Sequence, residues 1–129
     1  MAVPTIDNTD VDLLTLTAQG TGTVTSSTQV NEKCRGLIVV VDITAISGTG
    51  PTCTVTIQGY DEKSGKNYTL LASTGLNATA TTVLTVYPGC IASANAVANL
   101  PLPKYWNVKA VVAGTGPSVT ATIAASVIR

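Results

Sequence analysis

The feature of this sequence that most restricts its fold is a series of short segments in which apolar residues alternate with threonine between glycine- and proline-containing turns. Threonine occupies 22 of the 129 positions, and its β-branched side chain suits a half-exposed strand better than a helix. Candidate strands lie at about residues 12–18, 22–26, 36–46, 53–60, 68–73, 81–87, 105–113 and 118–128. This pattern predicts an all-β protein.

The segment Gly36–Ile46, GLIVVVDITAI, is the strongest strand candidate. It is apolar at every position from Leu37 to Val41 and alternates afterwards. A run of this kind is typical of a central strand that is covered on both faces. We therefore expect it in the middle of a sheet.

Two similar turn segments point to the architecture. SGTGPTCTVTIQG at 47–59 and AGTGPSVTATIAA at 113–125 match at seven of thirteen positions, and each joins two candidate strands. Each is expected to form a local hairpin, either as two similar turns or as the trace of a duplication. With a length that suits one two-layer core, the sequence predicts a single-domain antiparallel β-sandwich, Ig-like or jelly-roll-like, of about seven to nine strands.

Two segments fall outside the strand pattern. Residues 1–12 combine acidic residues with a proline and show no periodicity, which predicts an extended N-terminal arm before a sandwich domain at 13–129. Residues 89–104 form an Ala/Asn-rich loop of a length that is usually functional or crosses between two sheets. In the strand that follows, alternation places Trp106 in the core and Tyr105 on the opposite face.

The sequence lacks the residues of common catalytic sites. Histidine is absent, which removes the commonest general base and metal ligand. Asp61 and Glu62 lie beside lysines in a turn and are expected to be solvated, and the Ser64–Lys66 stretch lacks the spacing of a phosphate-binding loop. The three cysteines have no CxxC spacing and are expected to be small buried thiols. We predict no enzyme activity, no cofactor and no metal.

The low and balanced charge of the chain argues against nucleic acid and anionic membranes as partners. Seven Lys and Arg residues balance seven Asp and Glu residues, and charged residues make up only 11% of the chain. No field therefore draws the protein to nucleic acid or to an anionic membrane. No apolar stretch reaches the roughly 18 residues that cross a bilayer, and the N-terminal segment does not have the pattern of a signal peptide. The expected place of synthesis is the cytoplasm.

The order of segments resembles a known family. SGTGPTCTVTIQGYDEKSGKNYTLLAS and YWNVKAVVAGTGPSVTATIAASVIR follow an apolar strand, a Gly/Pro turn, a Thr/Val strand, a Ser-Gly turn and a closing Trp-Val hairpin. In this order, residues 36–129 resemble the small β-sandwich structural proteins of tailed bacteriophages. The resemblance implies a virion protein without catalytic residues, most often a decoration or cement protein on the capsid exterior. Its implied partners are the major capsid protein or other virion proteins.

The candidate contacts with those partners lie in the arm, in the loop and directly after the loop. They are Val3, Pro4 and Ile6 as apolar anchors, Asp7, Asp10 and Asp12 as partners of coat Lys or Arg, and Asn95, Asn99, Lys104 and Tyr105. A homo-oligomer is expected, with a trimer as one option.

Two alternatives remain open from the sequence. The chain could be a tail or neck component of the particle, or a carbohydrate- or cell-surface-binding module of a fibre. Sugar-binding sheets generally use exposed aromatic residues, and only four tyrosines accompany Trp106.

Overall fold

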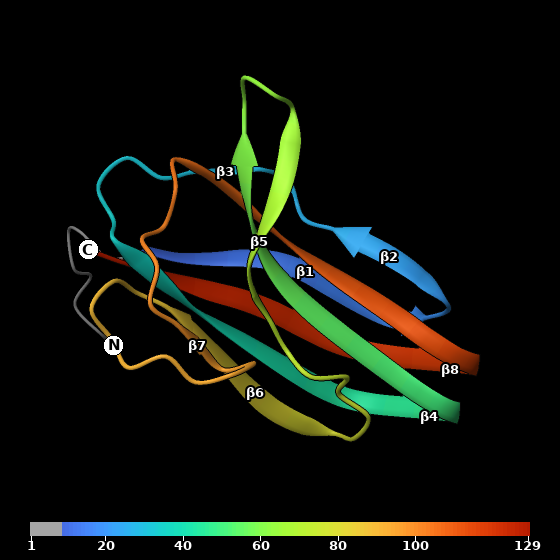
Figure 1. Ribbon diagram of the computed structural model, residues 1–129. Coiled ribbons are helices and arrows are strands. Elements are labelled where there is room, and N and C mark those ends of the chain that lie inside the picture. Colours follow the sequence, from blue (N-terminus) through green and yellow to red (C-terminus); the bar gives the residue numbers. More distant parts are fainter. Residues whose placement is uncertain (1–8) are drawn as a thin grey trace.

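The structure, a computed structural model, describes residues 9–129 and contains no helix in that range. Its strands (Figure 1) are β1 (Thr9–Gln19), β2 (Gly22–Thr25), β3 (Gln29–Val30), β4 (Gly36–Asp61), β5 (Lys66–Ala72), β6 (Ala80–Val86), β7 (Val97–Ala98) and β8 (Tyr105–Ile128). The prediction of an all-β domain is confirmed.

The centre of the fold is one long antiparallel ribbon made of β4 and β8. Pairing runs from Gly36 opposite Ile128 to Gly59 opposite Trp106. Midway, the ribbon passes through the two similar GTGP segments, where the register shifts and Thr49 lies opposite Thr115. The ribbon doubles back there, at the right of Figure 1.

Glycine is required at this fold-over because the two turns pack against each other. Gly48 has a φ of 120°, and a Cβ on it would lie 2.8 Å from the carbonyl oxygen of Gly116. Gly114 has a φ of 126°, and a Cβ on it would lie 2.8 Å from the carbonyl oxygen of Gly50. Each turn therefore occupies the space that a side chain on the other would need.

Folding over divides the sheet into two layers. Layer one contains β1, residues 118–128 of β8, residues 36–46 of β4, β6 and the short β7. Layer two contains β2 and β3, residues 105–113 of β8, residues 52–61 of β4, and β5. The chain also passes from one layer to the other between β1 and β2 and between β5 and β6. β1 and β2 pair with different halves of β8, and β5 and β6 pair with different halves of β4.

The strand order within the layers identifies the sandwich type. Layer one runs β1–β8–β4–β6 and layer two β2–β8–β4–β5, with β4 and β8 central in both. Eight strand segments in this order, formed by rolling up an antiparallel ribbon, make a jelly roll. Of the two sandwich types that the sequence left open, the structure therefore has the jelly-roll type.

Inward-facing side chains of both layers form one core. β-branched and other aliphatic residues alternate inward along each half of β4 and β8, and Trp106 is the largest fully buried side chain. This confirms the prediction that Trp106 is the core tryptophan. The fully buried aliphatic residues of the two long strands are Leu37, Val39, Val41, Val55, Ile57, Val108, Ala110, Val112, Val119 and Ile123.

Two buried serines hold the ends of the outer strands of layer two. After β2, the Ser26 hydroxyl accepts the N–H of Val108 at 2.9 Å, while the Ser26 N–H donates to the Val108 carbonyl at 2.8 Å. After β5, Ser73 makes the same pair of bonds with Val55, at 2.9 and 2.8 Å. Each serine satisfies both backbone groups of a central-strand residue where the outer strand leaves the sheet.

Strand positions agree with the sequence, but two of the expected hairpins are wrong. Residues 36–46 pair with 118–128 instead of 53–60, and residues 105–113 pair with 52–59. β1 and β2 follow each other in the chain but do not pair with each other, and both pair with β8. The turn expected at 61–66 is confirmed, and it joins β4 to β5 with Asp61 opposite Lys66.

The boundary of the N-terminal arm also differs from the expectation. Thr9 to Asp12, placed in the arm by the sequence, pair with Val127 to Ala124 as the start of β1. Residues 1–8 lie outside the described range.

Candidate interaction surfaces

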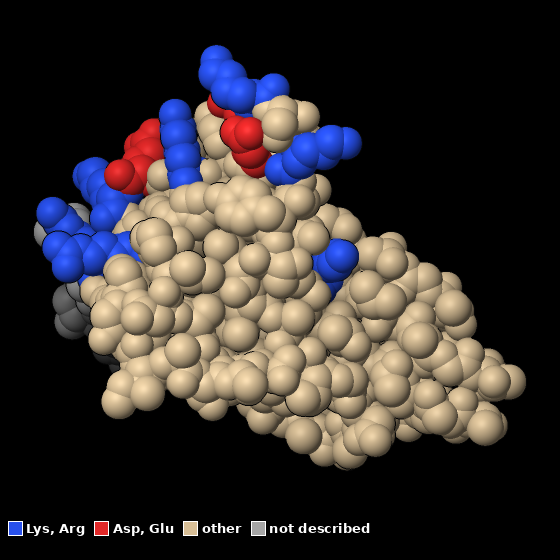
Figure 2. Space-filling view, in the orientation of Figure 1, with Lys and Arg blue, Asp and Glu red and all other residues tan. Residues whose placement is uncertain are grey.

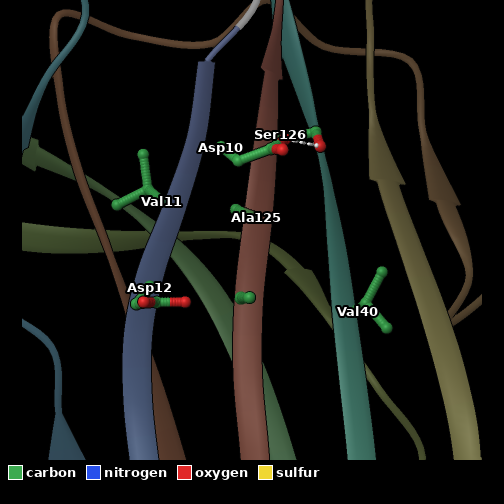
Figure 3. Close-up of a pocket in the computed structure, with 7 residues that line it drawn as sticks. Asp10, Val11, Asp12, Val40, Ala125 and Ser126 are labelled. Atoms are coloured by element: carbon green, nitrogen blue, oxygen red, sulfur yellow. Dashed lines mark hydrogen bonds between the residues drawn. The ribbon is translucent and has the colours of Figure 1, made fainter. Parts of the chain in front are cut away.

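The outer face of layer one carries a shallow pocket between β1, β8 and β4. Its volume is about 390 Å³, and its polar lining includes Asp10, Asp12 and Ser126. Figure 3 shows Asp10 and Asp12 on β1 and Val40 on β4, with β8 between them. The Ser126 hydroxyl donates to Asp10 Oδ1 at 2.5 Å, which fixes one carboxylate at the rim.

The register shows which side chains share this face. Residues directly opposite one another in antiparallel strands point to the same side of the sheet. Three rows therefore cross β1, β8, β4 and β6 in that order: Asp10–Ser126–Ile38–Thr85, Asp12–Ala124–Val40–Val83 and Thr15–Thr122–Asp42–Thr81. We call these twelve residues the acidic face, because every charged residue in them is an aspartate.

The middle of the acidic face is apolar and open. Val40 is 36% exposed and Val83 50% exposed, and the two lie opposite each other on β4 and β6. The expectation that Leu37–Val41 is covered on both faces is therefore wrong, although the strand is central. Val40 and Val83 therefore form a small exposed apolar row at the centre of the acidic face.

The loop expected between residues 89 and 104 crosses from layer one to layer two. Within it, β7 pairs in parallel with the end of β6. Asn95 has a φ of 60° and its side-chain amide donates to the Ala72 carbonyl at 3.0 Å, while Asn99 Oδ1 accepts the Gly89 N–H at 2.6 Å. Both asparagines are exposed, and their hydrogen bonds hold the shape of the loop.

The same loop exposes two large apolar side chains that the sequence analysis did not single out. Ile91 is 91% exposed and Leu100 is 39% exposed. Leu102, between two prolines, is instead buried, and its N–H donates to the Arg35 carbonyl at 2.8 Å. Exposure of Ile91 depends on the loop conformation, so no local sequence signal distinguishes it from a core residue.

Lys104 and Tyr105, also candidate contacts, lie at the end of the molecule near residues 31–35. The Lys104 ammonium lies 5.3 Å from the centre of the Tyr105 ring, and the Lys104 carbonyl accepts the Asn31 N–H at 2.6 Å. Lys104 is exposed and Tyr105 half-buried. Tyr105 begins the half of β8 that belongs to layer two, whereas the acidic pocket lies on layer one.

Of the predicted contacts, Val3, Pro4, Ile6 and Asp7 lie outside the described residues. Asp10 and Asp12 lie together on β1 at the pocket. Asn95 and Asn99 lie in the loop, and Lys104 and Tyr105 directly follow it. The structure therefore divides the described candidates among three places instead of one site.

On the face of the molecule that Figure 2 shows, charged side chains lie away from the end where β4 and β8 fold over. In Figure 2, blue and red atoms lie mainly at the upper left, while the right-hand end, where β4 and β8 fold over, is tan throughout. The sequence explains this distribution, because residues 13–31, 43–60, 67–103 and 110–128 contain no Lys, Arg, Asp or Glu. Most of the two outer faces is therefore neutral.

The turn between β4 and β5 holds an aspartate in a structural role. The pKa of Asp61 is lowered by hydrogen bonds from the Ser64 hydroxyl and from the backbone N–H groups of Lys63 and Ser64. The two backbone bonds measure 3.3 and 3.2 Å. Asp61 is therefore ionised at neutral pH and closes the turn, as its expected solvated position suggests.

This arrangement predicts a pH-dependent turn. Because the pKa of Asp61 is depressed on folding, its stabilising effect is present above the ordinary aspartate pKa and is lost as the pH falls through the folded value. In an NMR pH titration we expect the Asp61 carboxyl to titrate below an ordinary aspartate, and the Ser64→Ala variant to raise its pKa. An unshifted wild-type titration would contradict the role assigned to the turn.

The cysteines and acidic residues do not form a metal site in the described range. Between residues 9 and 129, no group of three or more Cys, Asp or Glu side chains lies close enough to hold an ion. Cys53 is buried, and burial raises the pKa of its thiol, which keeps it protonated and a weak nucleophile at neutral pH. The Cys90 thiol donates to the Tyr87 carbonyl at 2.8 Å.

No helix long and apolar enough to span a bilayer occurs between residues 9 and 129.

Comparison with known proteins gives few matches. No family model matches the chain, and no curated protein is significantly similar to it. Two solved structures of infectious bursal disease virus, from the Gt and Gx strains, cover 94% of this chain at 13% and 14% identity, with TM-scores of 0.44 and 0.43. The chain spans about a third of the length of those chains. Scores of this size do not establish a common fold, and the jelly-roll assignment depends on the strand order alone.

Proposed function

We propose that this chain is a non-enzymatic structural protein of a tailed-bacteriophage particle, which binds the outer surface of the head as a decoration or cement protein. The observation that carries the proposal is the neutral, Thr-rich surface of the domain, with its charges confined to a few places. A surface with so few charges promotes association with other proteins. Such a surface suits packing among many copies in a shell.

The strand order supports the same class of function. Jelly rolls occur in viral capsid proteins, in lectins and in cupins. Histidine, the commonest metal ligand, is absent from this chain. Because a fold alone does not determine function, the proposal depends on the exposed apolar residues and on the neutral surface together with the strand order.

The exposed side chains of the loop are suitable contacts with a coat protein. Ile91 and Leu100 expose apolar surface beside the asparagines that hold the loop in place. Apolar anchors in a fixed loop lose little conformational freedom on binding. We assign contact with the particle to this loop and to residues 1–8.

The mechanism is stabilisation by differential binding. A decoration protein stabilises a shell when it binds the assembled lattice more tightly than it binds free coat subunits. If each copy contacts more than one coat subunit, the shell must break several contacts to open, and the contacts reinforce one another. This role requires complementary surface and no catalytic group.

Binding to particles tests the proposal. Purified chain added to particles assembled without it should co-sediment with them and saturate at hundreds of copies per particle. Saturation at a few dozen copies or fewer would instead place the protein at the neck or tail. Absence of binding to particles, together with binding to a glycan array, would overturn the proposal in favour of a carbohydrate-binding module.

Deleting residues 1–8 tests the role of the N-terminal segment. The deletion ends before Thr9, because Thr9 to Asp12 pair with β8 and their removal would damage layer one. We expect the shortened chain to fold, with an unchanged circular dichroism spectrum, and to lose affinity for particles. An Ile91→Ser variant should weaken binding independently, and unchanged binding by both variants would contradict the assigned contacts.

A further inference from the structure

The zero net charge of the chain conceals a separation of charge. Outside the turn between β4 and β5, where two acidic and two basic residues cancel, most acidic and basic residues of the described range occupy different surfaces, and the exceptions are Glu32 and Lys109. The acidic face holds Asp10, Asp12 and Asp42, and all three are exposed. Lys and Arg do not occur in its three rows.

The basic residues gather where three chain segments meet. The Arg35 N–H donates to the Ile128 carbonyl at 2.9 Å, the Leu102 N–H to the Arg35 carbonyl at 2.8 Å, and the Asn31 N–H to the Lys104 carbonyl at 2.6 Å. These bonds bring residues 31–35, 102–104 and 128–129 together. We call the exposed Lys33, Arg35, Lys104 and Arg129 of these segments the basic end.

The two surfaces balance each other in number. The acidic face carries three negative charges, and the basic end carries four positive charges next to one glutamate, Glu32. The two surfaces also point in different directions, since one is the outer side of layer one and the other lies at the ends of its strands. A second copy can therefore place its basic end against the acidic face of the first.

We propose that copies of this chain associate head to tail, with the basic end of one copy seated on the acidic face of the next. Lys33 and Arg35 of one copy approach Asp12 and Asp42 of its neighbour, and the apolar row of Val40 and Val83 is covered between them. Contact between two unlike surfaces is heterologous, so it closes into a ring or continues along a lattice.

A second copy fits this face better than other occupants do. The acidic face combines an apolar centre with carboxylates, and the partner must therefore offer cations around neutral surface. The basic end of this chain has that composition, because the half-buried Pro103 and Tyr105 adjoin Lys104. A polyanion such as nucleic acid would be repelled by the aspartates.

Single charge reversals provide the first test, with sedimentation velocity as the readout. Asp12→Lys should weaken self-association by about tenfold or more, because the new cation faces the cations of the neighbour. Glu62→Lys makes the same change of charge in the exposed turn between β4 and β5 and should leave self-association unchanged. Wild-type association should also fall as salt is raised.

Mixing two reversed variants gives the decisive test. Asp12→Lys/Asp42→Lys makes the face basic, and Lys33→Glu/Arg35→Glu makes the basic end acidic. Each variant alone should remain monomeric because its like surfaces repel. In an equal mixture every contact between unlike variants is complementary, so association should return towards the wild-type level. Thermal unfolding of each variant shows whether it is folded.

Three outcomes would overturn the inference: a wild-type chain that is monomeric at all concentrations, reversed variants that associate as the wild type does, or folded variants whose mixture does not associate. The inference stands apart from the proposed function. Association without binding to particles would contradict only the virion role, and binding to particles by a strictly monomeric chain would contradict only the head-to-tail contact.

Discussion

Replacing Trp106 by alanine is expected to lower the free energy of unfolding by about 3–5 kcal/mol. Trp106 is 1% exposed and is the largest fully buried side chain of a core that contains no phenylalanine. Trp106 belongs to the core cluster formed by side chains of both layers, and its removal leaves a cavity there. Because domains of this size are stable by only about 5–15 kcal/mol, this loss removes a large part of the total stability.

Denaturant unfolding followed by circular dichroism measures this effect. Val83→Ala is the matched control, since Val83 is 50% exposed on layer one and should change the free energy of unfolding by less than about 0.5 kcal/mol. A loss of less than about 1 kcal/mol in the Trp106 variant would contradict the placement of this side chain.

Substituting alanine at Gly48 or Gly114 should have the second-largest effect. Each glycine combines a positive φ with a Cβ position 2.8 Å from a carbonyl oxygen of the facing turn. Strain in the backbone and the forced separation of the two turns together are expected to cost about 2–5 kcal/mol for each substitution. The double variant should not form the fold-over, and both layers should be lost together.

Two other glycines separate the causes of this effect. Gly50 has a φ of 58° but open space around its Cβ position, so Gly50→Ala should cost only about 1 kcal/mol. Gly20 has open space around its Cβ position and does not have a positive φ in the left-handed region. Gly20→Ala should therefore leave the free energy of unfolding nearly unchanged. Equal losses at Gly48, Gly50 and Gly20 would contradict the mutual packing of the two turns.

Strand positions could be predicted from the sequence because they depend on local pattern. Alternation of threonine with Val, Ile and Leu marked all the main strand segments, and the burial of Val55 and Ile57 on one side of β4 follows that alternation. Trp106 was assigned to the core for the same reason. In each case the side chain's direction is set by its neighbours in the chain.

Strand pairing could not be predicted in the same way. A GTGP turn that closes a hairpin and one that turns a ribbon over both use glycines with positive φ followed by proline. The difference lies in the partner, since residues 36–46 find theirs at 118–128. The similarity of the two turn segments was the only sequence signal for this pairing. Two turns that pack against each other in equivalent positions need the same backbone conformation, and therefore similar residues.

The acidic face shows the same limit. Asp10 and Asp12 could be named from the sequence, but their neighbours could not, because Val40 and Val83 join them only through the register of four strands. Asp42 sits in the strongest apolar strand and gave no sign of a surface role. Exposure of the valines follows from the absence of any element of the described chain over this face.

The position of β8 in the chain affects how the protein is made. In both layers the neighbour of β4 is β8, which is synthesised long after it, so neither half of β4 can complete its hydrogen bonds while the ribosome is still translating residues 62–104. Pairings between such distant segments form slowly. During that interval the apolar, almost uncharged nascent chain is prone to aggregate. Chaperones that bind nascent chains are therefore expected to act on this protein mainly before residues 105–128 emerge from the ribosome.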